Sequence, residues 1–427
     1  MKAQLWVVLG IAACVISWSY MHRVLLPWEH YVNVERGRVK EQMGDLYPRW
    51  VGTKELLLHG KNPYGPEVSR EIQNAFYGHP IQQNYDKPEF EIVDEQRFAY
   101  PVYVVFLLAP TVHAEFSSLQ AWAPVVFALL TAASVWVWLD ALRWRPSLFV
   151  TAAVMLFVLS SPQVAQGLRL RQFGLLVAFV LALATWCVSR GHNFAAGVLL
   201  AVATVKPQMG LFVLGCFSIW IVGDWRRRWR LALGFLGAMA VLVAAGEILL
   251  PAWPRFFVEG LAAYSKYFPL GTKTIARLIL GNWIGGAFSV VAILALIRFA
   301  WDRRHFEADS SEFFEVLSLF LIAATLVLPL LAPYNQVLLL LPAVIALRDW
   351  QRLNRWSRTV FAVLLGWPFA ASLLLLACRP DVNSFRRTPL LPSVLLVLTP
   401  FLMLWIMFDR RRMVAGSKTT GTPALFL

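Results

Sequence analysis

The residue with the most distinctive chemical setting is Asp45, within KEQMGDLYPRW at residues 40–50, shortly after the first apolar segment of the chain. A carboxylate near a membrane surface can act as a general base that takes a proton from a hydroxyl group. Aspartate is also favoured at helix N-caps and in first helical turns. The sequence leaves both roles open for Asp45, and one residue can fill both.

Positively charged residues in apolar surroundings are the next candidates. Lys206 precedes Pro207 inside an apolar stretch, where an ionisable side chain is costly and therefore a functional candidate. The alternative is a lysine that snorkels from a helix end. Arg169 and Arg171 lie in the stretch GLRLRQF, and their alternatives are topogenic or packing roles. Fixed positive charge in a low-dielectric site stabilises negative charge on a bound group.

A Pro-Tyr-Asn turn contributes Tyr334 and Asn335, which lie at a predicted helix end. These residues either contact a substrate or cap the helix. No cluster of His, Asp or Glu has the spacing of metal ligands, so neither a metal ion nor another cofactor is predicted. The four cysteines lie in or beside apolar runs and are interpreted as packing residues.

The composition indicates that these residues belong to a membrane protein. The chain is 58% hydrophobic and 15% charged, whereas soluble domains are about 25% charged. Its Lys and Arg residues cluster in short loops between apolar runs, which is typical of cytoplasmic loops under the positive-inside rule. The net charge of +14 therefore reflects membrane topology and argues against nucleic acid as a partner.

Apolar runs approaching the length of a membrane span predict an all-α polytopic bundle of about 12–13 transmembrane helices. The count depends on whether TVKPQMG divides the run at 193–223 into two short helices. The first run is expected to be a retained helix, because no signal-peptide cleavage site follows it. The candidate spans are 4–26, 98–114, 119–140, 147–164, 173–189, 193–223, 231–250, 283–299, 313–331, 335–348, 359–377 and 390–408.

Two polar segments interrupt the apolar pattern. Residues 27–97 carry 12 of the 25 acidic residues and contain an amphipathic stretch that predicts an interfacial helix with Asp45 near its start. Because a loop this long is usually functional, we expect residues 27–97 to form a first extracytoplasmic, catalytic loop. Residues 251–282 are predicted as a second large extracytoplasmic loop. The whole chain, 1–427, is expected to form a single integral-membrane domain.

Four stretches, in this order, resemble glycosyltransferase family 87, a group of integral-membrane enzymes with the GT-C fold. The first contains an Asp and ends in a Gly-x-x-Pro-Tyr turn, the second is an aromatic-Tyr-Pro entry into a span, and the third is a Gly-rich helix that ends in Lys-Pro. The fourth is the Pro-Tyr-Asn turn. The stretches are GDLYPRWVGTKELLLHGKNPY, FAYPVYVVFLLAP, AAGVLLAVATVKPQMGLFVL and APYNQVLLLLP. In one departure, the family usually shows Gly-Gln-x-Asn where this chain has RQFG, with Arg171 and Gly174 at the Gly and Asn positions.

The resemblance implies an inverting glycosyltransferase that moves a sugar, such as the hexose mannose, from a polyprenyl-phosphate donor to a glycolipid or glycan acceptor. The reaction takes place at the extracytoplasmic face. In family members the first outer loop supplies an Asp as the general base, and Asp45 is at the matching position. The expected donor phosphate-binding residues are Lys206, Arg171 and Arg169. The expected substrate-binding residues are Tyr47, Tyr64, Tyr100, Tyr334 and Asn335.

The main alternative to an enzyme is a polytopic transporter or flippase of lipid-linked sugars. Transporters tend to have inverted repeats and charged or broken helices at the bilayer midplane. The sequence shows no repeat, and its richest polar region is the segment 27–97. We therefore expect a monomeric, multi-pass enzyme of the plasma (inner) membrane, whose partners are the sugar donor, the acceptor and the lipid bilayer.

Overall fold

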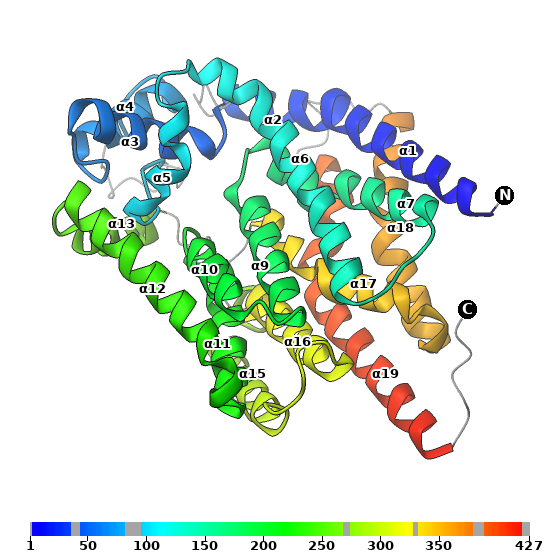
Figure 1. Ribbon diagram of the computed structural model, residues 1–427. Helices are drawn as coiled ribbons and strands as arrows, with labels where there is room; N and C mark the ends of the chain where they lie inside the picture. Colours follow the sequence, from blue (N-terminus) through cyan, green and yellow to red (C-terminus); the bar gives the residue numbers. More distant parts are fainter. Residues whose placement is uncertain are drawn as a thin grey trace.

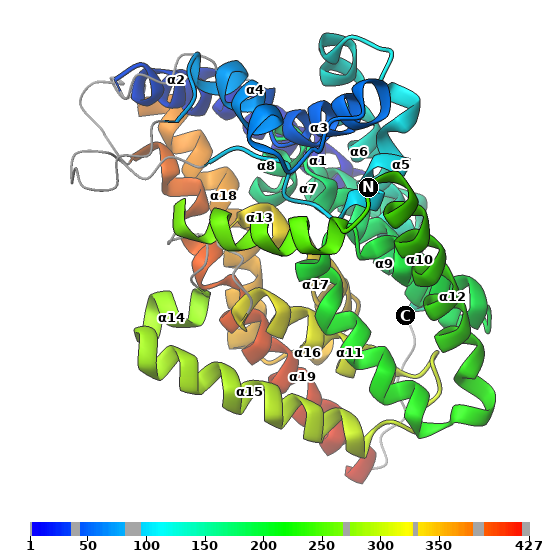
Figure 2. The same cartoon turned by 90° about the vertical axis from the view of Figure 1, so that its left-hand side faces the viewer.

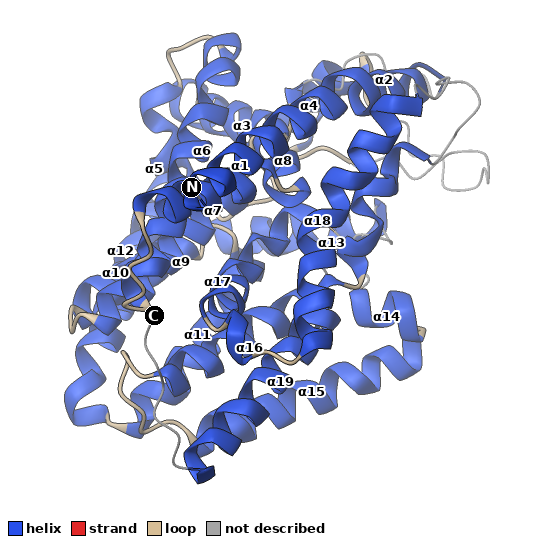
Figure 3. Ribbon diagram, turned by 90° about the vertical axis from the view of Figure 1, so that its right-hand side faces the viewer, coloured by secondary structure: helices blue, strands red, loops and turns tan. Residues whose placement is uncertain are grey.

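The computed structural model of the protein describes residues 2–35, 43–81, 95–267, 274–327, 332–378 and 388–420. Within these ranges every regular element is a helix (Figures 1 and 3). The predicted all-α class is therefore confirmed. The structure describes the two polar segments of the sequence in part.

Five helical segments are long and apolar enough to cross a membrane. The first, Gln4–Val32, runs through α1 (Lys2–Tyr20), η1 (Met21–Leu25) and α2 (Leu26–Glu35). The other four are α6 (Phe116–Ala141), α12 (Trp225–Leu249), α15 (Asn282–Asp302) and α18 (Arg355–Cys378). The protein is thus a multi-pass membrane protein.

Two further spans are bent at a short break, which brings the number of candidate spans to seven. One consists of α7 (Leu148–Ser160) and α8 (Pro162–Arg169), which meet at 61°. In the other, residues Pro389–Val397 of η7 (Thr388–Val397) meet α19 (Thr399–Thr420) at 45°. In the first pair Pro162 begins the second helix, and proline cannot donate the backbone hydrogen bond that would continue the preceding one.

Shorter apolar helices occupy most of the other predicted spans. The run at 193–223 is divided, because α10 (Asn193–Ala203) ends before Lys206 and α11 (Pro207–Gly223) begins after it. At 1.5 Å per residue, neither is as long as the hydrocarbon thickness of about 30 Å. The remaining inner elements are α9 (Phe173–Ser189), α16 (Ser311–Val327), η5 (Pro333–Leu339) and α17 (Leu340–Arg348).

Close packing of small residues holds the inner helices in place. A Cβ atom on Gly197 of α10 would lie 2.1 Å from the carbonyl oxygen of Leu231 on α12. A Cβ on Gly234 of α12 would lie 2.2 Å from the carbonyl oxygen of Phe194. The two backbones therefore touch, as is common where small residues line membrane-helix interfaces.

The helices of the first polar segment lie together at one end of the bundle. Figure 2 shows α3 (Leu46–His59) beside α4 (Pro66–Tyr77) there. α3 is the helix that the sequence predicts next to Asp45, and it ends at Gly60 in the left-handed conformation typical of a helix C-cap, with φ 66°. The second polar segment supplies α13 (Trp253–Tyr267) and α14 (Ile275–Leu280). α13 reaches the first segment, since the rings of Phe257 and Tyr64 are 6.4 Å apart.

Candidate active site

Asp45 precedes α3, but its side chain does not cap that helix. Instead, Nε2 of Gln172 donates a hydrogen bond to Oδ2 of Asp45. The backbone N–H of Asp45 donates to the carbonyl oxygen of Leu170 at 2.8 Å, which ties the start of α3 to the turn between α8 and α9. The sequence left two roles open for Asp45, general base and helix cap. In the structure its side chain does not cap the helix.

Left-handed backbone conformations bring these two segments together. Gly44 has φ 66°, and a Cβ atom on it would lie 2.9 Å from the carbonyl oxygen of Leu170. On the facing segment Arg171 has φ 53°, a conformation that residues other than glycine seldom adopt. The turn at Arg171 leads directly into Gln172, the N-cap residue of α9. Gly44 thus permits the close approach, and the turn at Arg171 starts α9 beside Asp45.

Lys206 lies between α10 and α11 with only 3% of its surface exposed. Its Nζ donates to Oε1 of Gln172 at 3.0 Å and to Oδ1 of Asn335 at 2.9 Å. The same ammonium group is 4.5 Å from the centre of the Tyr334 ring. A snorkelling lysine extends toward water, so Lys206, whose ammonium is directed into the protein, does not snorkel.

Gly174 leaves room for the lysine ammonium. A Cβ atom at this position would lie 3.1 Å from Nζ of Lys206 and 3.2 Å from Sδ of Met209. It would also lie 3.7 Å from Oδ1 of Asn335. A longer side chain at position 174 would therefore compete with Lys206 for the same space.

Burial and charge act in opposite directions on Asp45. The residue as a whole is half-buried, but its carboxyl group is enclosed by protein. Burial raises the pKa of Asp45, whereas the charges of Arg49 and Lys206 and a hydrogen bond with Tyr334 lower it. The pKa of Asp45 remains above its usual value. A raised pKa suits a general base that works near neutral pH.

Arg49 is a second cation beside Asp45. It lies one turn further along α3, where its Nη1 donates to the backbone carbonyl oxygen of Asp45 at 2.7 Å. Its guanidinium group stacks 4.5 Å from the centre of the Tyr100 ring. The rings of Tyr100 and Phe173 are 6.0 Å apart, so this contact reaches the start of α9. Tyr100 is therefore part of the wall of the site.

The model of glycosyltransferase family 87 matches residues 98–329, more than half of the chain. The chain belongs to glycosyltransferase family 87. The protein is therefore a membrane glycosyltransferase, an enzyme with a sugar donor and an acceptor as its substrates. No match to a curated protein was found.

The family match covers only the middle of the site. Gln172 and Lys206 lie within it, whereas Asp45 precedes it and Asn335 follows it. The fold of this family 87 enzyme joins the three parts, because Gln172 contacts both Asp45 and Lys206 while Lys206 contacts Asn335. Asp45 is thus placed in the site by geometry that the family match does not include.

Two predicted substrate-binding tyrosines support the surrounding helices. The Tyr47 ring packs 4.8 Å from the Phe116 ring and 5.9 Å from the Phe76 ring. The Tyr64 hydroxyl donates to the backbone carbonyl oxygen of Tyr100 at 2.6 Å. These contacts hold α3, α4 and the start of α6 together around the site.

Arg169 and Arg171 lie on the segment that leads into Gln172. Arg171 donates from Nε to the carbonyl oxygen of Gln120 at 3.1 Å and from Nη1 to that of Arg169 at 3.1 Å. Arg169 forms an ion pair with Glu29 of α2. These contacts agree with the packing roles that the sequence left open, and they also place two cations within three residues of Gln172.

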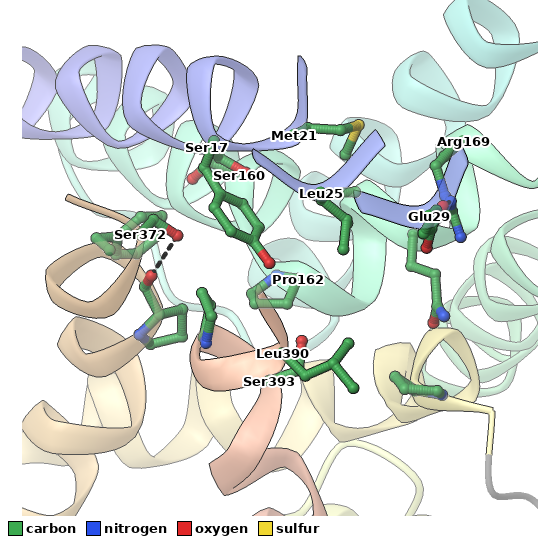
Figure 4. A pocket seen from close by; sticks show the side chains of 17 residues that line it. Ser17, Met21, Leu25, Glu29, Ser160, Pro162, Arg169, Ser372, Leu390 and Ser393 are labelled. Atoms are coloured by element: carbon green, nitrogen blue, oxygen red, sulfur yellow. Dashed lines mark hydrogen bonds and ion pairs between the residues drawn. The ribbon is translucent and has the colours of Figure 1, made fainter. Parts of the chain in front are cut away.

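The ion pair between Arg169 and Glu29 lines one end of a cavity, with Ser372 near the other end (Figure 4). The cavity contains about 660 Å³ of empty space, counted together with space open to solvent. Its walls come from the first span, α8, α18 and η7, and combine apolar side chains with serine hydroxyls. Pro333, the residue before Tyr334 in the chain, also lines it.

Two residues of the site were missed by the sequence prediction, namely Gln172 and Arg49. Gln172 occupies the Gln position of the family's Gly-Gln-x-Asn pattern, which was a usable signal. Arg49 follows Asp45 by four residues, and this spacing places the two on the same face of a helix. Within the described residues, no group of three His, Cys, Asp or Glu side chains is placed to hold a metal ion.

Proposed function

We propose that the enzyme transfers a sugar, such as a hexose, from a polyprenyl-phosphate donor to a hydroxyl group of a glycolipid or glycan acceptor, with inversion at the anomeric carbon. The reaction takes place at the extracytoplasmic face of the plasma (inner) membrane. The observation that supports this proposal is the enclosed carboxylate of Asp45. It accepts a hydrogen bond from Gln172 and does not cap α3.

In this proposal Asp45 is the general base. It takes the proton of the acceptor hydroxyl while the hydroxyl oxygen forms a bond to the anomeric carbon. The bond from that carbon to the donor phosphate breaks, and its electron pair leaves with the phosphate. The raised pKa of Asp45 favours proton uptake, and a base of this kind contributes about 10²–10⁴-fold in rate.

The donor phosphate is proposed to bind near Lys206, Arg171 and Arg169, where positive charge stabilises the leaving group. The buried Nε of Arg169 has no hydrogen-bond partner among the described residues, and a phosphate oxygen would supply one. A phosphate would also compete with Glu29 for the guanidinium group of Arg169. The apolar walls of the cavity suit the isoprenoid chain of the donor.

The sugar and the acceptor are proposed to lie between these cations and Asp45. Tyr334 and Asn335, which contact Lys206, are the nearest of the proposed substrate contacts. Tyr100 forms a wall through its stacking with Arg49, and Tyr47 and Tyr64 shape the outer part of the site. The protein is proposed to act as a monomer, with residues 27–97 forming the catalytic loop of a single domain.

Sugar transfer by the purified protein in vesicles tests this proposal. A panel of polyprenyl-phosphate sugars is offered with glycolipid acceptors, and one donor is expected to be consumed by the native protein but not by Asp45→Asn. Asp224→Asn is the matched control, because the Asp224 side chain caps α12 by accepting from the backbone N–H of Arg227. Equal rates in all three proteins contradict the proposal for Asp45. Movement of a donor across the bilayer without its consumption supports the transporter alternative.

A further inference from the structure

The Gln172 side chain lies between two groups of opposite charge. Only 2% of its surface is exposed. Its Oε1 accepts a hydrogen bond from Nζ of Lys206 at 3.0 Å, and its Nε2 donates to Oδ2 of Asp45. The two ends of an amide are chemically distinct, since the oxygen only accepts and the nitrogen only donates. An ammonium group only donates, so Lys206 determines that the amide nitrogen faces Asp45.

We propose that Gln172 is a positioning residue of the transfer reaction, with an amide that is oriented by Lys206 and holds the Asp45 carboxylate in the direction from which it accepts the proton. This inference rests on the proposed role of Asp45 as the base. It adds a residue that does not itself touch the reacting atoms. The side chain of Gln172 acts only through Asp45.

The surroundings fix both ends of the Gln172 amide. The backbone N–H of Gln172 donates to the carbonyl oxygen of Gly167 at 2.8 Å, which anchors the residue at the start of α9. Lys206 is itself held by a second acceptor, Asn335, at 2.9 Å. Because Gly174 leaves the space beside Nζ open, the lysine can reach Gln172 directly. The amide therefore has little freedom to turn away from Asp45.

The other charged and titratable groups around Asp45 differ from Gln172 in the contacts that they make. Arg49 donates from Nη1 to the backbone carbonyl oxygen of Asp45 and stacks on Tyr100. Tyr334 also forms a hydrogen bond with the carboxyl group, and this bond lowers the pKa of Asp45, but a hydroxyl can either donate or accept, whereas the amide nitrogen of Gln172 only donates. Arg171 donates to the backbone carbonyl oxygens of Gln120 and Arg169. Gln172 links the Asp45 carboxylate to the ammonium group of Lys206 through two hydrogen bonds, one at each end of its amide.

Three substitutions at position 172 separate positioning from packing. Gln172→Leu removes both hydrogen bonds, and Gln172→Glu keeps an acceptor for Lys206 but presents a second carboxylate to Asp45. Gln172→Asn keeps the amide on a shorter side chain and is expected to recover part of the activity. The matched control is Gln336→Leu, because Gln336 is a buried glutamine whose Nε2 donates only to the backbone carbonyl oxygen of Leu396, at 2.6 Å, among the described contacts.

The first measurement is the dependence of kcat and kcat/KM on pH. Gln172→Leu is expected to lower kcat by about 10²-fold, the loss that a misplacement of about 1 Å can cause, with the KM for the donor unchanged. The acidic limb of the profile should move to higher pH, because a hydrogen bond that favours the ionised carboxylate is lost. Gln172→Glu should move the acidic limb to a still higher pH, since a second carboxylate beside Asp45 disfavours the ionisation of Asp45. An acidic limb that stays in place in both variants overturns the inference, as does an equal loss in Gln336→Leu.

The second measurement needs no turnover. Infrared titration of the purified protein follows the C=O band of protonated Asp45, which is assigned by its loss in Asp45→Asn. The midpoint is expected at higher pH in Gln172→Leu than in the native protein, and an unchanged midpoint overturns the inference. If the native protein transfers no sugar, the proposed function fails, and the titration still decides whether Gln172 holds Asp45.

Discussion

Two aspartates of this enzyme lie in buried surroundings rich in positive charge. They differ in whether a cationic side chain contacts the carboxylate directly. Asp45 is linked to Lys206 through the amide of Gln172. Asp349, which follows α17, contacts its partners directly, with Nε of Arg410 at 2.6 Å and Nε of Arg348 at 3.3 Å. The first arrangement separates opposite charges by one side chain, and the second brings them into contact.

The pKa shifts of the two aspartates have opposite directions. Burial alone raises the pKa of Asp349, but Arg348 and Arg410 outweigh burial and hold the pKa below its usual value. At Asp45 burial outweighs the nearby charges, and the pKa is raised. A carboxylate in direct ion pairs holds its charge and ties helices together. A carboxylate behind an interposed amide remains ready to accept a proton, which is what a general base requires.

The largest effects are expected when each aspartate is neutralised in turn. Asp45→Asn is expected to lower the sugar-transfer rate by about 10²–10⁴-fold while the thermal midpoint of unfolding is kept. Asp349→Asn is expected to lower the midpoint, because Arg410 then lacks its closest carboxylate, while the folded fraction keeps the native rate. Transfer assays and thermal unfolding in the same detergent measure both effects. Loss of rate in both variants to the same degree would contradict the assignment of different roles.

The direct ion pairs can be tested from the cationic side. Arg410→Met leaves Asp349 buried with less compensation, and we expect a destabilisation of about 3–5 kcal/mol in the free energy of unfolding. The control is Arg411→Met. The side chain of Arg411 is 39% exposed, and its Nε lies 3.5 Å from Oε1 of Glu315. This second change should cost no more than about 1 kcal/mol. Thermal or denaturant unfolding compares the two, and equal losses would show that burial does not set the strength of these pairs.

Removal of the distant cation sharpens the comparison at the candidate active site. Lys206→Met takes away a charge that lowers the pKa of Asp45, so this pKa should rise further above its usual value. In the proposed mechanism Asp45 works in its deprotonated form, so activity should rise with pH through its pKa, and the acidic limb of the pH–rate profile should move to higher pH. Lys54→Met is a control on α3, where the ammonium group of Lys54 lies 5.1 Å from the centre of the Trp50 ring. A limb that moves equally in both variants would argue against a specific role for Lys206.

The smallest effect is expected at an exposed ion pair. Nη2 of Arg143 lies 2.7 Å from Oδ2 of Asp309, and the two side chains are 64% and 38% exposed. Arg143→Ala should change the free energy of unfolding by no more than about 1 kcal/mol, since solvent screens such pairs. Unfolding experiments at low and at high salt measure this change in free energy. A loss as large as that of Arg410→Met would remove the distinction between buried and exposed contacts.

Much of the site was predictable, but its connections were not. Asp45, Lys206 and Asn335 stand out in the sequence because of their type and setting, and the structure places all three in one network. Gln172 occupies the Gln position of the family pattern, but it carries no charge, and the sequence does not show that it lies between Asp45 and Lys206. The predicted substrate contacts of Tyr47 and Tyr64 stay predictions. In the structure the Tyr47 ring packs on Phe116, and the Tyr64 hydroxyl donates to the backbone carbonyl oxygen of Tyr100.

The sequence by itself determined the helical, membrane-spanning class of this protein, because long apolar runs must satisfy their backbone hydrogen bonds internally in lipid. It left open whether the run at 193–223 is divided, and the structure shows that it is, with α11 beginning at Pro207, which cannot continue the preceding helix. Only the tertiary structure decided which residues meet. Gln172 is 127 positions from Asp45, and Lys206 is 34 positions from Gln172 and 129 from Asn335. Contacts over such separations depend on how the helices pack and where the backbone turns at Gly44 and Arg171, and no local pattern contains that information.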